Sequence, residues 1–271
     1  MNNKPIIAIV VSFITIVSSG CQKESKGAGP EWEELYDEAL SHFDANRKVE
    51  GEELIRKAYV IAEKNASHDH PDFARSLHGM GNVYANSGEP EKAEEAWLQA
   101  LDIRRKALGN QHVDTGHTLH NLGRFRAERE RLDEAMVDLN ESLSIFENTN
   151  GKEHLEVGKV LVTRAVAYAM NDELFLCEFD IDRAKSIFES QPKPFEKGLR
   201  DVHRAQARLY FNTKEYGQAE AELLTALELT ESIFGSNSQE SKSPLKYLQE
   251  IYRRTNRTQD ANRIGKQLAL L

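Results

Sequence analysis

Residues of the same kind recur every 42 positions along most of this chain of 271 residues. One column of the repeat contains small residues at Ala39, Gly81, Gly123, Ala165 and Ala207, with Gln249 as the exception. Two more columns of mostly small residues, beginning at Gly51 and Ala58, keep the same period, and so does a column of tyrosines at 84, 168, 210 and 252. Self-similarity at a fixed period of this length is typical of a solenoid, in which each unit packs on its neighbours. The period therefore favours a stack of about six similar units over a single globular core.

Each unit is expected to be a pair of amphipathic helices. In the second unit, Leu77, Met80, Val83 and Tyr84 have the spacing of one apolar helix face. The turn that follows, residues 87–90, ends in a proline, which suits the first turn of a new helix. The columns of small residues fit positions where two helices cross closely, since small side chains there leave room for larger ones beside them. The sequence thus predicts an all-α protein.

The pattern L-x2-M-G-x2-Y, followed by A-x3-W-x2-A, resembles the tetratricopeptide repeat. The 42-residue period is longer than the usual ~34 residues, and with the stretch 100–123 it is similar to the kinesin light chain-type subfamily. This resemblance implies a right-handed α-solenoid of about six helix-turn-helix repeats over residues 32–271, with an extended concave surface. The expected units lie near 32–73, 74–115, 116–157, 158–199, 200–241 and 242–271. The fourth unit departs most from the pattern, because Arg164 occupies a normally apolar column.

Histidine recurs on the same period in the connections between units. His70, His112 and His154 are followed two residues later by Asp72, Asp114 and Glu156 respectively. Negative charge is favourable at a helix N-terminus, so these acidic residues fit the first turn of each unit. A shared metal is unfavourable, because its ligands must lie about 2 Å from one ion whereas adjacent helix axes are about 8–10 Å apart. We therefore interpret the histidines as structural and expect no metal site.

The N-terminus has a different character. A short apolar run, Ile6 to Val17, follows one lysine and leads through small residues to Cys21. The run is shorter than the ~20 residues of a spanning helix and is typical of a secretory signal peptide. The sequence V-S-S-G-C resembles the lipobox of bacterial lipoproteins, which implies a signal peptide over 1–20 and a lipidated cysteine. An ordinary cleaved signal and an uncleaved anchor are the alternatives.

The resemblance to lipoproteins also implies where the protein acts. Residues 21–31 would contain the lipidated Cys21 and a flexible tether, because they are polar, contain glycine and lack an apolar period. In Gram-negative lipoproteins, Gln22 at the position after the cysteine resembles the signal for sorting to the outer membrane. We therefore expect a lipid-anchored protein of the bacterial cell envelope, on the periplasmic face of the outer membrane rather than on the inner membrane.

Composition and motifs favour a binding protein over an enzyme. The net charge is −9 and the basic residues are dispersed, which is not the pattern of a nucleic-acid-binding protein. The motifs G-x-S-x-G, G-x-x-x-x-G-K-[ST], H-E-x-x-H and C-x-x-C do not occur. We expect a scaffold that binds a protein or peptide partner, without catalytic residues or a cofactor. The alternative is a small-molecule-binding protein or an enzyme of the envelope built on the same solenoid.

The tetratricopeptide resemblance also implies a binding groove, because the first helix of each repeat lines the concave face in that family. Carried onto this sequence, the inward positions are Arg75, His78, Asn82, His117, His120, Arg124, Lys159, Arg204, Arg208 and Phe211. Most of them are basic or polar, which predicts a groove for an extended acidic segment or a C-terminal carboxylate. The reference pKa of histidine is near 6.5, so the three histidines should strengthen anion binding as the pH falls. The alternative is that these are ordinary solvated helix residues.

Overall fold

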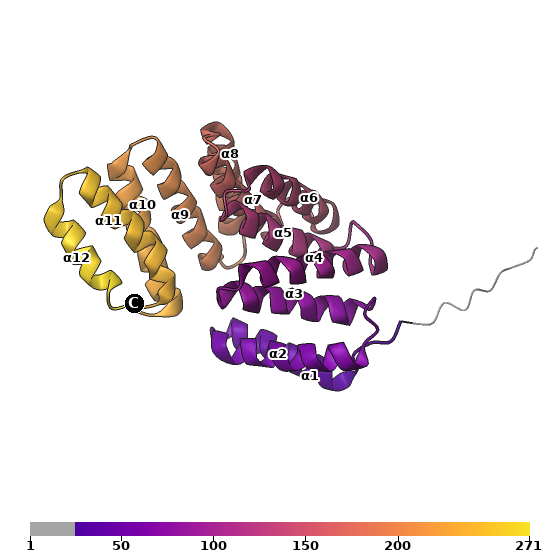
Figure 1. Cartoon of the computed structure of the whole chain (residues 1–271). Helices are drawn as coiled ribbons and strands as arrows, with labels where there is room; N and C mark the ends of the chain where they lie inside the picture. Colours follow the sequence, from indigo (N-terminus) through magenta and orange to yellow (C-terminus); the bar gives the residue numbers. More distant parts are fainter. Residues whose placement is uncertain (1–24) are drawn as a thin grey trace, which may run out of the picture.

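The computed structural model describes residues 25–271, which fold into twelve α-helices and one short 3-10 helix without a β-strand. The helices are α1 (Pro30–Asp44), α2 (Lys48–Asn65), α3 (Pro71–Asn86), α4 (Pro90–Ala107), α5 (Val113–Ala127), α6 (Leu132–Asn150), α7 (Leu155–Met170), α8 (Leu174–Glu189), α9 (Glu196–Asn212), α10 (Tyr216–Phe234), η1 (Gln239–Ser241), α11 (Lys242–Arg254) and α12 (Thr258–Leu268). Successive helices pack in pairs, from α1 with α2 to α11 with α12, and each pair packs on the next. Figure 1 shows the hairpins stacked into a curved array with α1 and α12 at opposite ends. The predicted all-α solenoid of about six helix-turn-helix repeats is thus confirmed.

The 42-residue period also appears in the backbone. The turn inside each hairpin contains one residue with positive φ, at Asn46, Gly88, Glu130, Asp172, Lys214 and Asn256. Glycine, asparagine and aspartate visit this left-handed region readily, whereas Glu130 (φ 60°) and Lys214 (φ 65°) adopt it at a local energetic cost. Because the conformation is kept while the residue type changes, the packing of the two helices fixes the turn.

Small residues occupy the close crossings within the hairpins, as the repeat predicted. Ala93 and Ala135 are completely buried. A Cβ atom added at Gly123 would lie 2.6 Å from Cγ of Leu139, a distance that real Cβ atoms do not reach. Larger side chains therefore fill the space that the small residues leave, which gives the close packing of a protein interior.

The buried apolar core of the described residues is divided along the solenoid into four clusters. The longest, which we call the central cluster, extends from Ala127 to Leu209 and joins α5 to α9. An N-terminal cluster runs from Ala28 to Ala100, and a C-terminal cluster runs from Ala207 to Ile264. A fourth cluster around Trp97 lies between the N-terminal and central clusters. The core is therefore a row of local clusters rather than one continuous body.

The repeated histidines have a structural role as helix caps. His70, His112 and His154 are the N-cap residues of α3, α5 and α7. The Nδ1 atom of each accepts a hydrogen bond from the backbone N–H two residues later, at 3.1, 3.1 and 3.2 Å respectively. Each cap satisfies one of the N–H groups that a helix start leaves unpaired. The period of the histidines follows from the period of the helix starts.

The fourth unit keeps the hairpin despite Arg164. Its guanidinium donates from Nε and Nη2 to the two carboxylate oxygens of Asp180, at 2.7 and 2.8 Å. The Asp180 side chain is 1% exposed, so this ion pair lies inside the hairpin of α7 and α8. In the third unit Asp138 lies 42 residues earlier and accepts a hydrogen bond from Arg126 at 2.7 Å. An ion pair thus replaces an apolar contact without changing the fold.

The N-terminal segment differs from the flexible tether expected over 21–31. Helix α1 begins at Pro30, and the backbone of Lys26 pairs with Ser67 in the connection between α2 and α3. Ala28 is only 3% exposed and belongs to the N-terminal cluster. The expectation of a flexible tether is therefore wrong from residue 25 onward, because this part of the chain contributes to the core.

The signal peptide predicted over 1–20 and the lipidation site predicted at Cys21 lie outside the described residues. Between residues 25 and 271, no helix is both long enough and apolar enough to cross a membrane.

Candidate functional site

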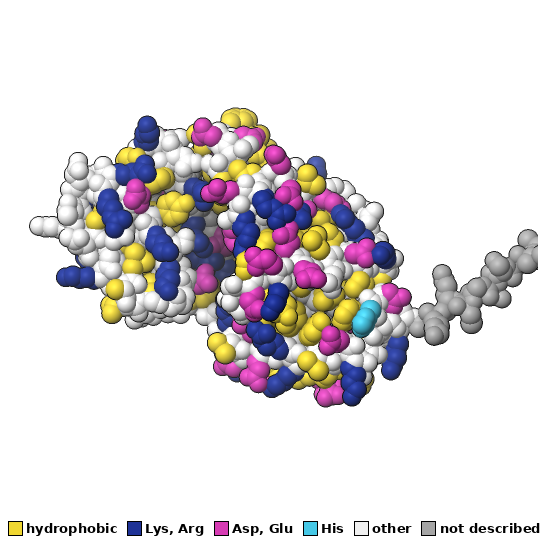
Figure 2. All heavy atoms as spheres, viewed as in Figure 1, with side chains coloured by type: hydrophobic (Ala, Val, Ile, Leu, Met, Phe, Trp, Pro, Cys, Tyr) yellow, Lys and Arg dark blue, Asp and Glu magenta, His cyan; other side chains and the backbone are white. Residues whose placement is uncertain are grey.

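The concave side of the solenoid contains a groove of about 930 Å³, which is lined mainly by α5, α7 and α9. Ser243, Pro244 and Tyr247 of α11 also line it, and the buried side chains of Phe188 and Leu223 from second helices adjoin it. Figure 2 shows the molecule hollowed near its centre, with lysine and arginine side chains inside the hollow. The first helices of the repeats therefore line a concave surface, as the resemblance implied.

The groove has an excess of positive charge. Of the predicted site residues, it brings together His120, Arg124, Lys159, Arg204 and Arg208. Lys197 and Arg200, which the sequence reasoning missed, also line it. The carboxylates in the lining are those of Asp44, Glu128, Asp201 and Glu240. Six lysine or arginine side chains thus face four carboxylates, although the whole chain has a net charge of −9.

Among the groove residues, Arg200 has a buried donor atom without a hydrogen-bond partner. The residue is 8% exposed, and its Nε and Nη2 donate to Oδ1 of Asp201 at 3.0 and 2.8 Å. Its Nη1 is buried without a hydrogen-bond partner, and the nearest carboxylate oxygen, on Glu240, is 3.9 Å away. A buried donor without a partner is costly, so a ligand oxygen that reached Nη1 would remove that cost.

The spacing of basic residues in the sequence could have identified Lys197 and Arg200 as groove residues. Lys197, Arg200, Arg204 and Arg208 follow one another at intervals of three or four, which places them along one face of α9. The predicted positions in α9 were obtained by adding 42 to the inward positions of the preceding repeat. The first of these, Lys159, corresponds to residue 201, which lies one helical turn after Lys197. A search for basic residues at helical spacing within α9 alone would have found the complete row.

The other predicted residues are not part of the groove lining. Asn82 accepts a hydrogen bond of 2.8 Å from Asn121, whose side chain lies 3.3 Å from Nε2 of His78. The guanidinium of Arg75 lies over the ring of Tyr36 at 4.4 Å. These contacts join neighbouring first helices and leave less of each side chain for a ligand.

His117 and Phe211 likewise make contacts within the solenoid. His117 lies 3.7 Å from Glu156, and its ring packs edge-on against Phe146. Phe211 packs edge-on against Tyr247, with 5.6 Å between ring centroids. It therefore contacts a residue of the groove lining without being part of that lining itself.

The predicted role of the histidines in pH-dependent anion binding is wrong. Burial lowers the pKa of His120 to about 3, with the charge of Arg124 as a second cause. Burial also holds the pKa of His78 well below 6.5, again assisted by nearby arginines. The pKa of His117 is lowered by burial as well, although Glu156 opposes the shift. His78 and His120 are therefore neutral near pH 6.5, His117 binds a proton less readily than a free histidine, and the anion-attracting charge of the groove comes from lysine and arginine.

The arrangement is suited to binding anions rather than to covalent chemistry. Cys177 is buried, and burial together with Asp180 raises the pKa of its thiol to about 12, so it is a poor nucleophile. Over residues 25–271, no three side chains of histidine, cysteine, aspartate or glutamate are grouped so that they could hold a metal ion.

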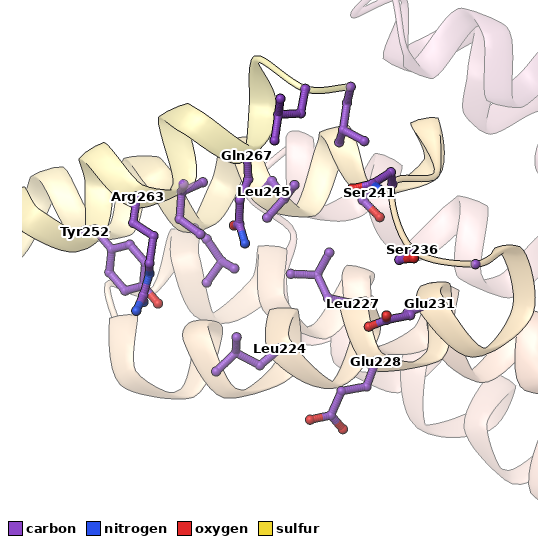
Figure 3. A pocket seen from close by; sticks show the side chains of 16 residues that line it. Leu224, Leu227, Glu228, Glu231, Ser236, Ser241, Leu245, Tyr252, Arg263 and Gln267 are labelled. Carbon is purple, nitrogen blue, oxygen red and sulfur yellow. The ribbon is translucent and has the colours of Figure 1, made fainter.

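A second cavity of about 540 Å³ lies between α10, α11 and α12. Leu224, Leu227 and Leu245 point into it in Figure 3, while Glu228 and Glu231 lie on one side and Arg263 on the other. Its polar groups do not converge on one point, as a site for a small polar molecule would require.

Comparison with known proteins agrees with the repeat and the fold. The tetratricopeptide repeat family matches residues 39–106 and 72–148. The structure of BtubC (BKLC) from P. vanneervenii is similar with a TM-score of 0.57 and 18% identity, covering 75% of this chain and 81% of that one. A Podosopora anserina kinesin light chain with nearly identical TPR-like repeats is similar with a TM-score of 0.56 and 19% identity, covering 75% and 96%. PilW, a type IV pilus biogenesis factor, has a TM-score of 0.56 and 16% identity, covering 89% and 93%. No curated protein sequence matches the chain significantly.

Fold and groove together define an all-α solenoid of helix hairpins with a cationic concave surface, and its fold is similar to that of tetratricopeptide-repeat proteins. The sequence match to the repeat family covers part of the chain, and the structural likeness to kinesin light chain-type proteins extends over three quarters of it. At these identities the likeness concerns the fold.

Proposed function

We propose that this protein is a scaffold, anchored in the bacterial cell envelope through lipid on Cys21, that binds an acidic segment of a protein partner in its groove. The observation that carries the proposal is the row of cations on α9, with the Nη1 atom of Arg200 buried and unpaired. Arginine binds a carboxylate through two parallel hydrogen bonds, and such charge-assisted bonds are about twice as strong as neutral ones. An extended chain with several carboxylates fits a groove that spans three repeats better than a compact ligand does.

The groove is tested by titrating a labelled acidic peptide against the wild type and against the double variant Arg204→Glu, Arg208→Glu. We expect at least a tenfold loss of affinity in the double variant, about 1.4 kcal/mol. Wild-type affinity should also fall between about 0.01 M and about 0.15 M salt, because the Debye length shrinks from about 30 Å to about 8 Å. The control is Lys64→Glu, Arg253→Glu, which reverses two exposed charges outside the groove and should bind like the wild type.

Two results would contradict the proposed groove. Binding that survives the reversal in α9 and does not respond to salt would place the site on an apolar surface. The exposed side chains of Phe175 (78%) and Phe179 (58%) on α8 are then the surface to test.

The anchor has its own test. Cys21→Ala should leave the protein unlipidated, so it should no longer enter the detergent phase when membranes are extracted. If this variant is processed and partitions as the wild type does, Cys21 is not the anchor.

A further inference from the structure

The chain joins the solenoid through a short segment, Ser25–Ala28, which we call the N-terminal latch (Figure 1). Four hydrogen bonds hold it against the connection between α2 and α3 and the first turn of α3: Ser25 Oγ to Asp69 at 2.9 Å, Lys26 N–H to Ser67 Oγ at 2.8 Å, Ser67 N–H to the Lys26 carbonyl at 2.7 Å, and Ala28 N–H to Asp72 at 2.9 Å. Backbone groups of the latch take part in three of these bonds, so the contact fixes the path of the chain and not only its side chains.

The latch is also closely packed. A Cβ atom at Gly27 would lie 2.9 Å from Oδ2 of Asp72 and 3.2 Å from Cε1 of His70, so a larger residue there would displace these side chains or the latch. Five residues after Gly27, Nε1 of Trp32 donates to Oγ of Ser76 at 2.7 Å inside the core. The segment thus continues without interruption into the N-terminal cluster.

The latch leaves only a short length of chain before the proposed anchor. Cys21 precedes Ser25 by four residues, and an extended chain spans at most about 3.6 Å per residue. The latch is therefore held within about 14 Å of a lipid attached at Cys21.

The connection that receives the latch lies at one edge of the solenoid. Residues 66–70, 108–112 and 151–154 each lead from the second helix of one hairpin to the first helix of the next, so they share this edge. The turns inside the hairpins form the opposite edge, one helix length away. For the 18 residues of α4, this length is about 27 Å.

We infer that the latch orients the solenoid on the bilayer, with the edge that contains the α2–α3 and α4–α5 connections nearer the lipid than the opposite edge of the same hairpins. The inference rests on the proposed lipid anchor at Cys21.

The test uses the lipidated full chain, purified from membranes and reconstituted into vesicles of phosphatidylethanolamine and phosphatidylglycerol with a fluorescent acceptor on some headgroups. A donor dye is attached at Asn110→Cys or at Glu91→Cys, two exposed positions near opposite ends of α4. Cys177 does not compete for the dye, because it is buried and its thiol pKa is raised to about 12. We expect higher energy transfer from position 110 than from position 91.

Two further variants distinguish the effect of tether length on the energy transfer from the effect of the latch. An insertion of about 20 glycine and serine residues after Gln22 adds a reach of about 25 Å, so it should lower the transfer from position 110 and reduce the difference between the two dyes. Gly27→Leu keeps the chain length but displaces the latch, and it should reduce the same difference. If this variant does not fold, the insertion alone carries the comparison.

The outcomes separate the inference from the anchor. Equal transfer from both positions in the wild type, or transfer that the insertion leaves unchanged, would overturn the inferred orientation while leaving the anchor intact. Wild-type protein that does not remain with the vesicles would overturn the anchor, and the orientation with it.

Discussion

Lowering the pH should destabilise the solenoid through the histidines of its inner face. The His120 ring lies 2.8 Å from Oγ1 of Thr163, and burial lowers its pKa to about 3. In the unfolded chain the pKa of histidine is near 6.5, so the unfolded state binds a proton that the folded state excludes. The stabilisation is therefore complete above about pH 6.5 and decreases as the pH falls below it.

The magnitude follows from the two pKa values. Between pH 7.5 and pH 5.5, His120 alone should remove about 1.4 kcal/mol from the free energy of unfolding. Burial holds the pKa of His78 well below 6.5 too, so its effect has the same sign. Urea unfolding at the two pH values, followed by the fluorescence of the buried Trp32 and Trp97, measures the change.

Two variants isolate the contribution of His120. His120→Gln should reduce the loss between pH 7.5 and pH 5.5 by about 1.4 kcal/mol, since glutamine does not titrate. Thr163→Ala removes the hydrogen-bond partner but keeps the buried ring, so it should retain the pH dependence of the wild type. An NMR titration in which the His120 ring protonates near pH 6.5, or an unchanged pH dependence in His120→Gln, would refute the reasoning.

Three further predictions concern the packing of the hairpins. Ala135→Leu should cost about 1–3 kcal/mol by overpacking a completely buried crossing, whereas Val137→Leu on the same helix, 67% exposed, should be nearly neutral in thermal unfolding. Arg164→Leu should cost about 3–5 kcal/mol, because it leaves the carboxylate of Asp180 buried without its cation, and the double variant Arg164→Leu, Asp180→Leu should recover part of that loss. Single-variant and double-variant costs that simply add would contradict a direct pair. Alkylation of Cys177 at pH 8 should be slow in the native protein and rapid in urea, since the thiol pKa is raised to about 12; rapid native labelling would contradict its burial.

The repeat was sufficient to predict the fold because it is a local pattern written six times. Small residues such as Ala93 and Ala135 can be assigned to helix crossings from their period alone, and the crossings are where the structure places them. The histidine caps follow from the same period, since each lies at the start of a first helix.

The remaining features depend on contacts between distant parts of the chain. The sequence indicates that His120 faces inward. How far its ring is buried depends on how closely α5 and α7 approach each other, and this burial determines the pKa of the ring. Arg200 is missed when columns are carried from one repeat to the next, because its equivalents in the earlier repeats are the small residues Ala74, Gly116 and Gly158. Ser25–Ala28 looks like a tether by composition, and only its hydrogen bonds to residues more than forty positions away show otherwise.

The division of the core into four clusters has a consequence for how the molecule responds to stress. Opening the terminal hairpin of α11 and α12 exposes the C-terminal cluster but leaves the central cluster, which carries most of the groove, in place. Amide hydrogen exchange should accordingly be fastest in the outer helices and slowest in α7 and α8, with each hairpin opening as a separate foldon. A ligand that contacts α5, α7 and α9 together connects three successive units. Its binding should therefore make these units open together rather than one at a time, and should slow amide exchange in all three.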